Sequence, residues 1–279
     1  MATVQASSSA VKRAAGNPVL QLLERLGYAV RGALYAVMGL LALGIALRVG
    51  IGQTTDLSGS LVFLAGNPFG KLVLVVAAIG LTAYSLWGFT RAFYDPLRRG
   101  SDAGGYAARL GFISSAVSYA AIVFFSLQLL AGSGTAGDST QKTIASILVH
   151  PGGGSLTVLI GIVAIVVGLG QFLEAYRATF KADLKSADMS STERDTAIKL
   201  GRFGMFSRGV IFLVIGWFIV QAGIHHDASQ VQGFGGAFMY LLGQPFGRLL
   251  LSFIALGFVA LGLHSFACAR WIRLLGSSA

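Results

Sequence analysis

Six long apolar runs limit what this chain can fold into. Each is close to the roughly 20 residues that an α-helix needs to cross the hydrocarbon core of a membrane. Inside a bilayer the backbone must bond within its own segment, so the runs predict helices. We expect an all-α polytopic membrane protein, and its 11% charged residues are far fewer than the about 25% of soluble domains. The runs cover roughly residues 28–47, 69–90, 112–131, 156–176, 206–222 and 246–269.

The chain also repeats itself. The phrases GNPFGKLVL, VHPGGGSLTVL and GQPFGRLLL contain Pro68, Pro151 and Pro245, which are spaced 83 and 94 residues apart. A second set of phrases, RLGYAVRGALY, RLGFISSAVSY and RFGMFSRGVIF, precedes them with spacings of 84 and 93. Two independent markers with nearly one period indicate an internal triplication. The second set begins at Arg25, Arg109 and Arg202.

The proline phrases predict where each returning helix starts. A proline is harmless in the first turn of a helix, and it keeps the preceding residue out of the helical region. Asn67 is a suitable N-cap. Lys71 and Arg248 are expected to extend to headgroups at the outer interface. The predicted helix-start motif consists of Asn67, Pro68, Phe69, Gly70, Lys71, Pro151, Pro245, Phe246, Gly247 and Arg248.

Each predicted unit is a helix, an outer loop and a returning helix. Two crossings bring the chain back to its starting side, so successive units have the same orientation, unlike inverted transporter repeats. Three parallel two-helix repeats predict rough threefold pseudo-symmetry about an axis along the membrane normal. The predicted organisation is a cytoplasmic tail at 1–17, repeat 1 at 18–97, an eroded repeat 2 at 98–180, a charged connector at 181–199 and repeat 3 at 200–279.

The net charge of +10 is distributed unevenly across the predicted membrane. Of the 21 Lys and Arg, 17 flank the side that holds both termini and 4 flank the other. The positive-inside rule therefore places both termini in the cytoplasm. Anionic lipid headgroups on that side are the expected partners, together with other membrane proteins. Nucleic acid is not an expected partner because no binding motif accompanies the charge.

The phrases LGYAVRGALYAVMG and NPFGKLVLVVAAIGLTAYSLW, with their partial copies, resemble a bacterial membrane family catalogued as domain of unknown function 1206. The resemblance extends from about residue 23 to 273, and repeat 2 departs from the pattern. There Ser115 replaces the Arg31 and Arg208 of the other repeats, and glycines follow the proline. The resemblance implies repeated two-helix units and the bacterial cytoplasmic (inner) membrane, but no chemistry.

Ionisable residues at membrane depth form the candidate polar site, which consists of Glu174, Arg31, Arg208, Arg91 and His264. Glu174 occupies the repeat position of Arg91 and Cys268. It is interpreted either as a carboxylate that handles protons or cations near an arginine, or as a helix-end partner of Arg177. Arg31 and Arg208 either bind a phosphate-bearing headgroup or a carboxylate, or mark the inner interface.

The remaining candidates are histidines and acids. His264 is interpreted as a packing histidine, with haem ligation or proton relay as the alternative. A metal site at His225, His226 and Asp227 is not expected, because adjacent loop residues are a weak signal. Asp56, Asp138 and Asp227 are interpreted as loop polarity instead of a ring at a pore mouth. We expect no cofactor, no metal and no catalytic residues.

The sequence thus predicts a non-enzymatic membrane protein, a scaffold or accessory subunit that binds lipid or other membrane proteins. The alternative is a small channel or transporter for ions or a small solute along the pseudo-threefold axis. A membrane enzyme or redox carrier that uses His264 or Glu174 ranks last. The ligand, the partner proteins, the oligomeric state and the physiological role do not follow from the sequence.

Overall fold

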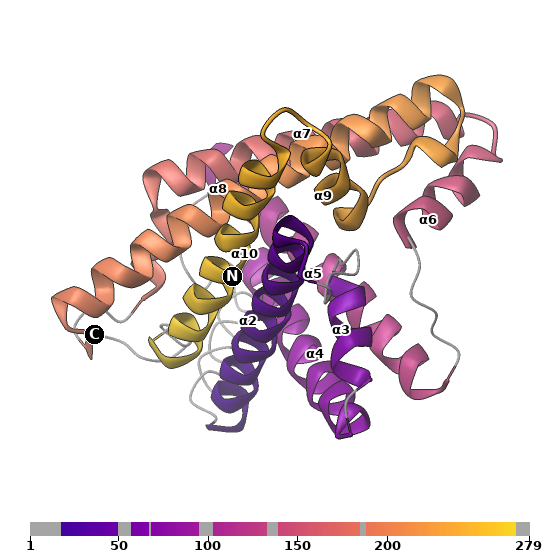
Figure 1. Ribbon diagram of the computed structural model, residues 1–279. Coiled ribbons are helices and arrows are strands. Elements are labelled where there is room, and N and C mark those ends of the chain that lie inside the picture. The colour runs from indigo at the N-terminus through magenta and orange to yellow at the C-terminus, as the bar shows by residue number, and fades with distance from the viewer. Residues whose placement is uncertain are drawn as a thin grey trace.

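The computed structural model describes residues 18–49, 57–66, 68–94, 103–132, 139–184 and 188–271, and the elements in these ranges are all helices. Six of them are long and apolar enough to cross a membrane. The predicted all-α, six-span architecture is therefore confirmed, and the protein is a multi-pass membrane protein. The long helices are α2 (Pro18–Leu47), α4 (Gly70–Tyr94), α5 (Ala103–Leu130), α7 (Gly153–Arg177), α8 (Ser191–His225) and α10 (Gly247–Trp271) (Figure 1). The predicted tail 1–17, Asn67 and Asp56 lie outside the described residues.

Each predicted outer loop contains a short helix that the sequence analysis did not anticipate. These are α3 (Leu57–Ala65), α6 (Ser139–Leu148) and α9 (Phe234–Leu242), of 9 or 10 residues, too short to span a bilayer. Each short helix buries one apolar side chain seven residues before its proline. The anchors Leu61, Ile144 and Phe238 are 0%, 3% and 0% exposed, so the short helices are packed onto the long ones.

The proline phrases form a tight turn ahead of the returning helix. Gly152, directly after Pro151, has φ 79° and ψ 0°, which are the values of the third residue of a type II turn. The Gly153 N–H closes this turn on the His150 carbonyl at 2.9 Å. Helices α4, α7 and α10 begin two residues after their prolines, so these prolines precede the first helical turn instead of lying within it.

The glycine that ends each turn is required by a close approach of the backbone. A Cβ atom on Gly70, Gly153 or Gly247 would lie 1.8, 2.1 or 2.0 Å from a carbonyl oxygen of the preceding short helix. No side chain fits there, because real Cβ atoms do not come within 3.0 Å of other heavy atoms. This explains why the glycine recurs in all three phrases, including the eroded one.

The long helices pack in a cyclic order. The three most extensive contacts join the second long helix of one repeat to the first of the next, namely α4 with α5, α7 with α8, and α10 with α2. The α10–α2 contact returns from the last repeat to the first. Within repeats, α2 packs on α4 and α8 on α10, whereas α5 and α7 of the eroded repeat have no comparable contact. A threefold relation would give this order, and the pseudo-symmetry itself stays a prediction.

The three principal interfaces also share one register. The residue seventeen positions after each proline is Ser85, Gly168 or Gly262. It contacts the next repeat in the cyclic order, at the residue seven positions after that repeat's first arginine, which is Ala116, Gly209 or Gly32. Ser85 Oγ donates to the Ala116 carbonyl at 2.8 Å. A Cβ on Gly168 would lie 3.0 Å from the Gly209 carbonyl oxygen, and one on Gly32 would lie 3.0 Å from that of Gly262. Small residues at these points let the helices approach closely.

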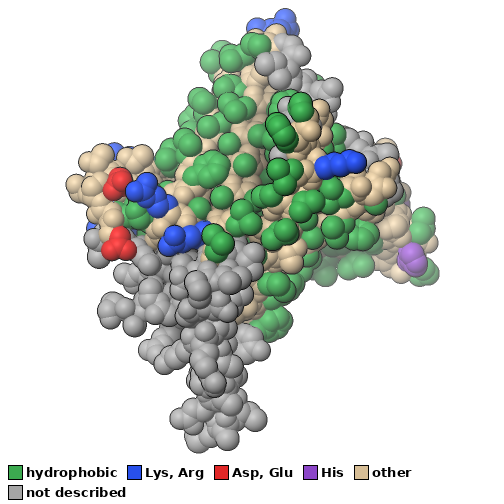
Figure 2. All heavy atoms as spheres, turned by 90° about the horizontal axis from the view of Figure 1, so that it is seen from below, with side chains coloured by type: hydrophobic (Ala, Val, Ile, Leu, Met, Phe, Trp, Pro, Cys, Tyr) green, Lys and Arg blue, Asp and Glu red, His purple; other side chains and the backbone are tan. Residues whose placement is uncertain are grey.

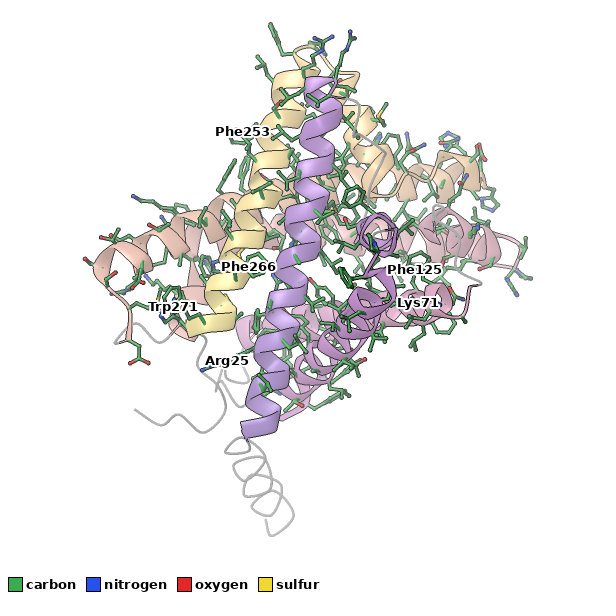
Figure 3. All side chains as sticks on the ribbon, turned by 60° about the horizontal axis from the view of Figure 1, so that its bottom comes forward. Arg25, Lys71, Phe125, Phe253, Phe266 and Trp271 are labelled. Atoms are coloured by element: carbon green, nitrogen blue, oxygen red, sulfur yellow. The ribbon has the colours of Figure 1, made fainter. Side chains whose placement is uncertain are left out.

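Helices α2 and α10 run antiparallel along their common length. Arg25 near the start of α2 and Trp271 at the end of α10 lie toward the same end of this pair in Figure 3. Both residues lie in segments that the charge distribution assigns to the cytoplasmic side.

Helix α8 starts earlier than the predicted boundary of repeat 3. Ser190 and Glu193 form a capping box, in which the Glu193 N–H donates to Ser190 Oγ and Glu193 accepts from the Ser190 N–H. Residues 191–199 of the predicted connector are therefore helical and continuous with α8. The S-x-x-E pattern was the sequence signal for this helix start.

Candidate functional site

Arg31 is a buried cation surrounded by tyrosine rings. Its side chain is 9% exposed, and its guanidinium carbon lies 5.9, 5.5 and 5.3 Å from the ring centroids of Tyr28, Tyr35 and Tyr84. Its Nη1 donates a hydrogen bond to the Tyr84 hydroxyl. Tyr28, Arg31 and Tyr35 are three and four residues apart, so they lie on one face of α2. The rings partly replace water around the cation through cation–π attraction.

A second cation reaches the same tyrosines from α8. Arg208 Nη1 donates to the Tyr35 hydroxyl at 3.2 Å, and Arg208 Nε and Nη2 both donate to Oε1 of Gln171 on α7. The Tyr35 hydroxyl also lies 3.0 Å from that of Tyr119 on α5. Arg31 and Arg208 therefore flank one tyrosine, although they belong to different repeats.

We call this group the Arg–Tyr cluster. Five of the six long helices contribute to it. Tyr84 and Tyr119 pack edge to face with centroids 4.8 Å apart, and Tyr28 packs on Tyr84 at 5.0 Å. The tyrosines are 3–6% exposed, whereas Arg208 and Gln171 are half-buried. The members of the Arg–Tyr cluster are Tyr28, Arg31, Tyr35, Tyr84, Tyr119, Gln171 and Arg208.

The Arg–Tyr cluster carries two positive charges and no carboxylate. Of the chain's 11 acids, only Glu174, Glu193 and Asp195 fall within the six spans, and the last two lie on the exposed start of α8. An arginine at the centre of a membrane helix costs about 2.5–3.5 kcal/mol on insertion scales. Arg31 Nε is buried with no hydrogen-bond partner among the described residues. Within the described residues, the charge of the cluster is thus only partly compensated.

Glu174 lies one helical turn beyond Gln171 on α7 and forms hydrogen bonds at the end of that helix. Its oxygens accept hydrogen bonds from Thr179 Oγ1 at 2.6 Å and from the Phe180 N–H at 2.8 Å. These groups begin the 3₁₀-helix η1 (Thr179–Asp183), which follows α7. Glu174 therefore caps a turn, and among the described residues its hydrogen bonds involve neither Arg177 nor Arg31 or Arg208.

His264 lies in a packed environment on α10. It is 3% exposed, its Nδ1 donates to the Ala197 carbonyl at 2.9 Å, and its Nε2 lies 3.4 Å from the Cys268 sulfur. The Phe180 ring meets the imidazole edge to face at 4.9 Å. This environment joins α8, α10 and η1, and it corresponds to the interpretation of His264 as a hydrogen-bonded packing residue.

The other predicted site residues are dispersed. Arg91 lies on α4, with its side chain outside the described part of the structure. Lys71 and Arg248 are exposed near the starts of their helices, as are Phe69 and Phe246 at 74% and 82% exposure. These exposed positions fit an interfacial motif and do not extend the Arg–Tyr cluster.

The histidines on the predicted outer side bond to their own backbone. His225 and His226 bond through Nδ1 to the carbonyls of Gln221 and Gly223. Asp227 accepts from the Ser229 N–H at 2.9 Å, and hydrogen bonds from the side chain and backbone of Ser229 hold the pKa of Asp227 below its usual range. Over the described ranges, no three His, Cys, Asp or Glu side chains gather as metal ligands.

The sequence analysis missed the tyrosines and Gln171. The signal for Tyr35 and Tyr119 was present, because they end the first two arginine phrases at the same repeat position. Tyr84 and Gln171 had no comparable signal, since their role depends on contacts across helices. The sequence analysis singled out Arg31 and Arg208 as related candidates, but their common partner Tyr35 follows only from the tertiary structure.

Comparisons with known proteins agree with the repeats. A family described as Domain of Unknown Function (DUF1206) matches residues 26–95, 110–178 and 203–271. An uncharacterized protein of Bacillus subtilis (strain 168), YxxB, is 34% identical over 248 residues, which cover 89% of this chain and 90% of that protein. No solved structure matches the chain. The three matches span most of the chain at the predicted period, and the protein therefore belongs to the family described as Domain of Unknown Function (DUF1206).

Proposed function

We propose that the protein is a non-enzymatic scaffold or accessory subunit of the bacterial cytoplasmic membrane, which binds lipid along the outer surface of its helix bundle. The observation that carries this proposal is the exposure of the eroded repeat. In the most apolar segment of each long helix, only 17% of α7 and 24% of α5 is buried inside the protein. The corresponding share is 44–56% in α2, α4, α8 and α10.

Helix α7 presents a continuous apolar surface along its length. The exposed side chains recur three or four residues apart, as one broad face of a helix requires. They are Leu156, Leu159, Ile162, Val163, Val166, Leu169 and Leu173. Figure 2 shows that the face seen from below in Figure 1 is also largely covered by hydrophobic side chains, with Lys and Arg near its margins.

The ends of this surface favour lipid as the occupant. Tyr176 is 82% exposed and Arg177 is exposed at the end of α7, a pairing typical of the membrane–water interface. Nearby, Arg202 is also exposed, and its Nη2 donates to the Tyr176 carbonyl. A basic end beside an apolar stripe is complementary to an anionic headgroup and its acyl chains.

The packing of the interior supports binding over conduction. Met38 of α2 and Phe258 and Leu261 of α10 are fully buried, and they belong to one core with Phe238 and Ile211. Large apolar side chains thus occupy the space between the long helices. If the alternative of a channel applied instead, reconstituted protein would carry ion or solute flux above that of empty vesicles.

The test is lipid retention. The full chain is extracted in a mild neutral detergent, and bound lipids are measured by native mass spectrometry. We expect anionic lipid to be enriched over its share of the membrane, and Arg177→Gln to reduce this enrichment. Lys142→Gln, an exposed change near the other side, is the matched control. A reproducible protein partner without lipid would indicate an accessory subunit, whereas neither lipid nor partner would contradict the proposal.

A further inference from the structure

We propose that the Arg–Tyr cluster is an internal binding site for an oxyanion of the phosphate class. This inference concerns the interior of the bundle and does not depend on lipid binding at the surface of α7. The site consists of the guanidinium groups of Arg31 and Arg208, the hydroxyls that surround them and the amide of Gln171.

The first argument is unused hydrogen-bonding capacity. An arginine offers five N–H donors, and buried donors are normally satisfied. Among the described residues, Nη1 of Arg31 donates to the Tyr84 hydroxyl, whereas its Nε is buried without a hydrogen-bond partner. The Arg31 side chain is 9% exposed, so water does not surround these donors. An acceptor on a bound ligand would satisfy these N–H donors of Arg31.

The second argument is charge. Arg208 donates to a neutral amide and a neutral hydroxyl, and the Arg31 guanidinium faces three neutral rings. Two cations beside one tyrosine repel each other in a medium of low dielectric constant. Glu174, which lies three residues beyond Gln171 on α7, is engaged by Thr179 and Phe180. A bound anion is the group that would neutralise both arginines together.

The third argument is the chemistry of the donors. The planar guanidinium binds phosphate oxygens in pairs, and tyrosine hydroxyls add single donors. The half-buried members, Arg208 and Gln171, mark the side from which a ligand would reach the buried arginine. Tyr119 and Gln171 come from α5 and α7, the two long helices of one repeat that lack an extensive mutual contact. The phosphate comes either from a lipid headgroup or from a free anion.

The experiment measures ligand-dependent stability of the full chain. In neutral detergent, inorganic phosphate is compared with chloride at equal ionic strength, by thermal unfolding and by titration calorimetry. In nanodiscs, phosphatidylglycerol is compared with phosphatidylcholine. A response to inorganic phosphate identifies a free anion, and a response to phosphatidylglycerol alone identifies a headgroup. The absence of both responses in the wild-type chain overturns the proposal, whatever the variants do.

The variants locate the site. Arg208→Gln is expected to weaken binding at least about tenfold, since it removes a charged donor. Arg194→Gln is the matched control, because Arg194 is exposed on the same helix and should keep the wild-type response. If Arg208→Gln does not fold, Arg31→Lys takes its place with the same expectation. This change keeps the positive charge but removes the planar guanidinium that binds two oxygens at once. Equal binding by the cluster variant and the control would exclude the Arg–Tyr cluster as the phosphate-binding site, even if lipid is retained at α7.

Discussion

The hydroxyl groups of Tyr35 and Tyr119 lie 3.0 Å apart, and the two residues hold the same position in successive repeats. The corresponding residue of repeat 3 is Phe212, which has no hydroxyl. Arg208, from repeat 3, instead donates to Tyr35. Equivalent residues from copied units therefore meet in the interior of the bundle, and their divergence produces one asymmetric polar cluster.

The Tyr35 hydroxyl should contribute measurably to stability. Tyr35→Phe removes a group that bonds to both Tyr119 and Arg208, so the buried Tyr119 hydroxyl and the half-buried Arg208 each lose a partner. We expect the free energy of unfolding to fall by about 1–3 kcal/mol. Denaturant unfolding in mixed micelles measures it. Tyr240→Phe, at a residue 45% exposed, should change it by less than about 0.5 kcal/mol. Equal effects of the two changes would contradict the hydrogen-bonded arrangement.

The α7–α8 interface should not tolerate a single added methyl group. A Cβ on Gly161 would lie 2.7 Å from the Val220 backbone nitrogen and 2.8 Å from the Gly216 carbonyl oxygen. Gly161→Ala should therefore lower the free energy of unfolding by about 1–3 kcal/mol through overpacking. Gly170 on the same helix has no atom within 4 Å of the new position. Gly170→Ala should stabilise by up to about 1 kcal/mol through helix propensity. We expect the unfolding midpoint of Gly161→Ala to lie below the wild-type value and that of Gly170→Ala to lie above it. The reverse order would exclude the close contact.

The two glycines of the phrase GQPFG should respond differently to substitution. Gly247→Ala would bring a Cβ within 2.0 Å of the Leu242 carbonyl oxygen, whereas the nearest atom for Gly243→Ala is 3.5 Å away. We expect Gly247→Ala to destabilise by about 1–3 kcal/mol or to prevent folding. Size-exclusion profiles and thermal unfolding in detergent report either result. A normal profile for Gly247→Ala would show that the proline turn is not built as described.

The orientation of the repeats can be tested by cysteine labelling. Cys268→Ser removes the single cysteine, and exposed positions on either side then receive a new one. We expect Ser229→Cys to react with a membrane-impermeant maleimide on intact cells, because it follows α8 on the predicted outer side. Asp188→Cys should react only after the cells are opened, because the predicted cytoplasmic connector contains it. The opposite pattern would reverse the orientation of all three parallel repeats.

The candidate site shows how far local sequence patterns extend. Arg31 and Arg208 stand out from the sequence because charge inside an apolar run is rare and costly. Glu174 stands out for the same reason, yet within the described residues its hydrogen bonds come from Thr179 and Phe180, five and six positions away. The difference depends on which face each residue presents to its neighbours, and hydropathy does not encode that face.

The sequence by itself determined the membrane-spanning helices and the triplication, because transfer into a bilayer and helix length depend on contiguous residues, and copying leaves a period. It also marked the helix starts through their prolines. Only the tertiary structure decided the cyclic helix order, the turn glycines and the Arg–Tyr cluster. These features rest on contacts between residues far apart in the chain, such as Tyr35 and Arg208, which are separated by 173 positions. Such contacts depend on how close the backbones can approach, and that distance is set by small residues on facing helices.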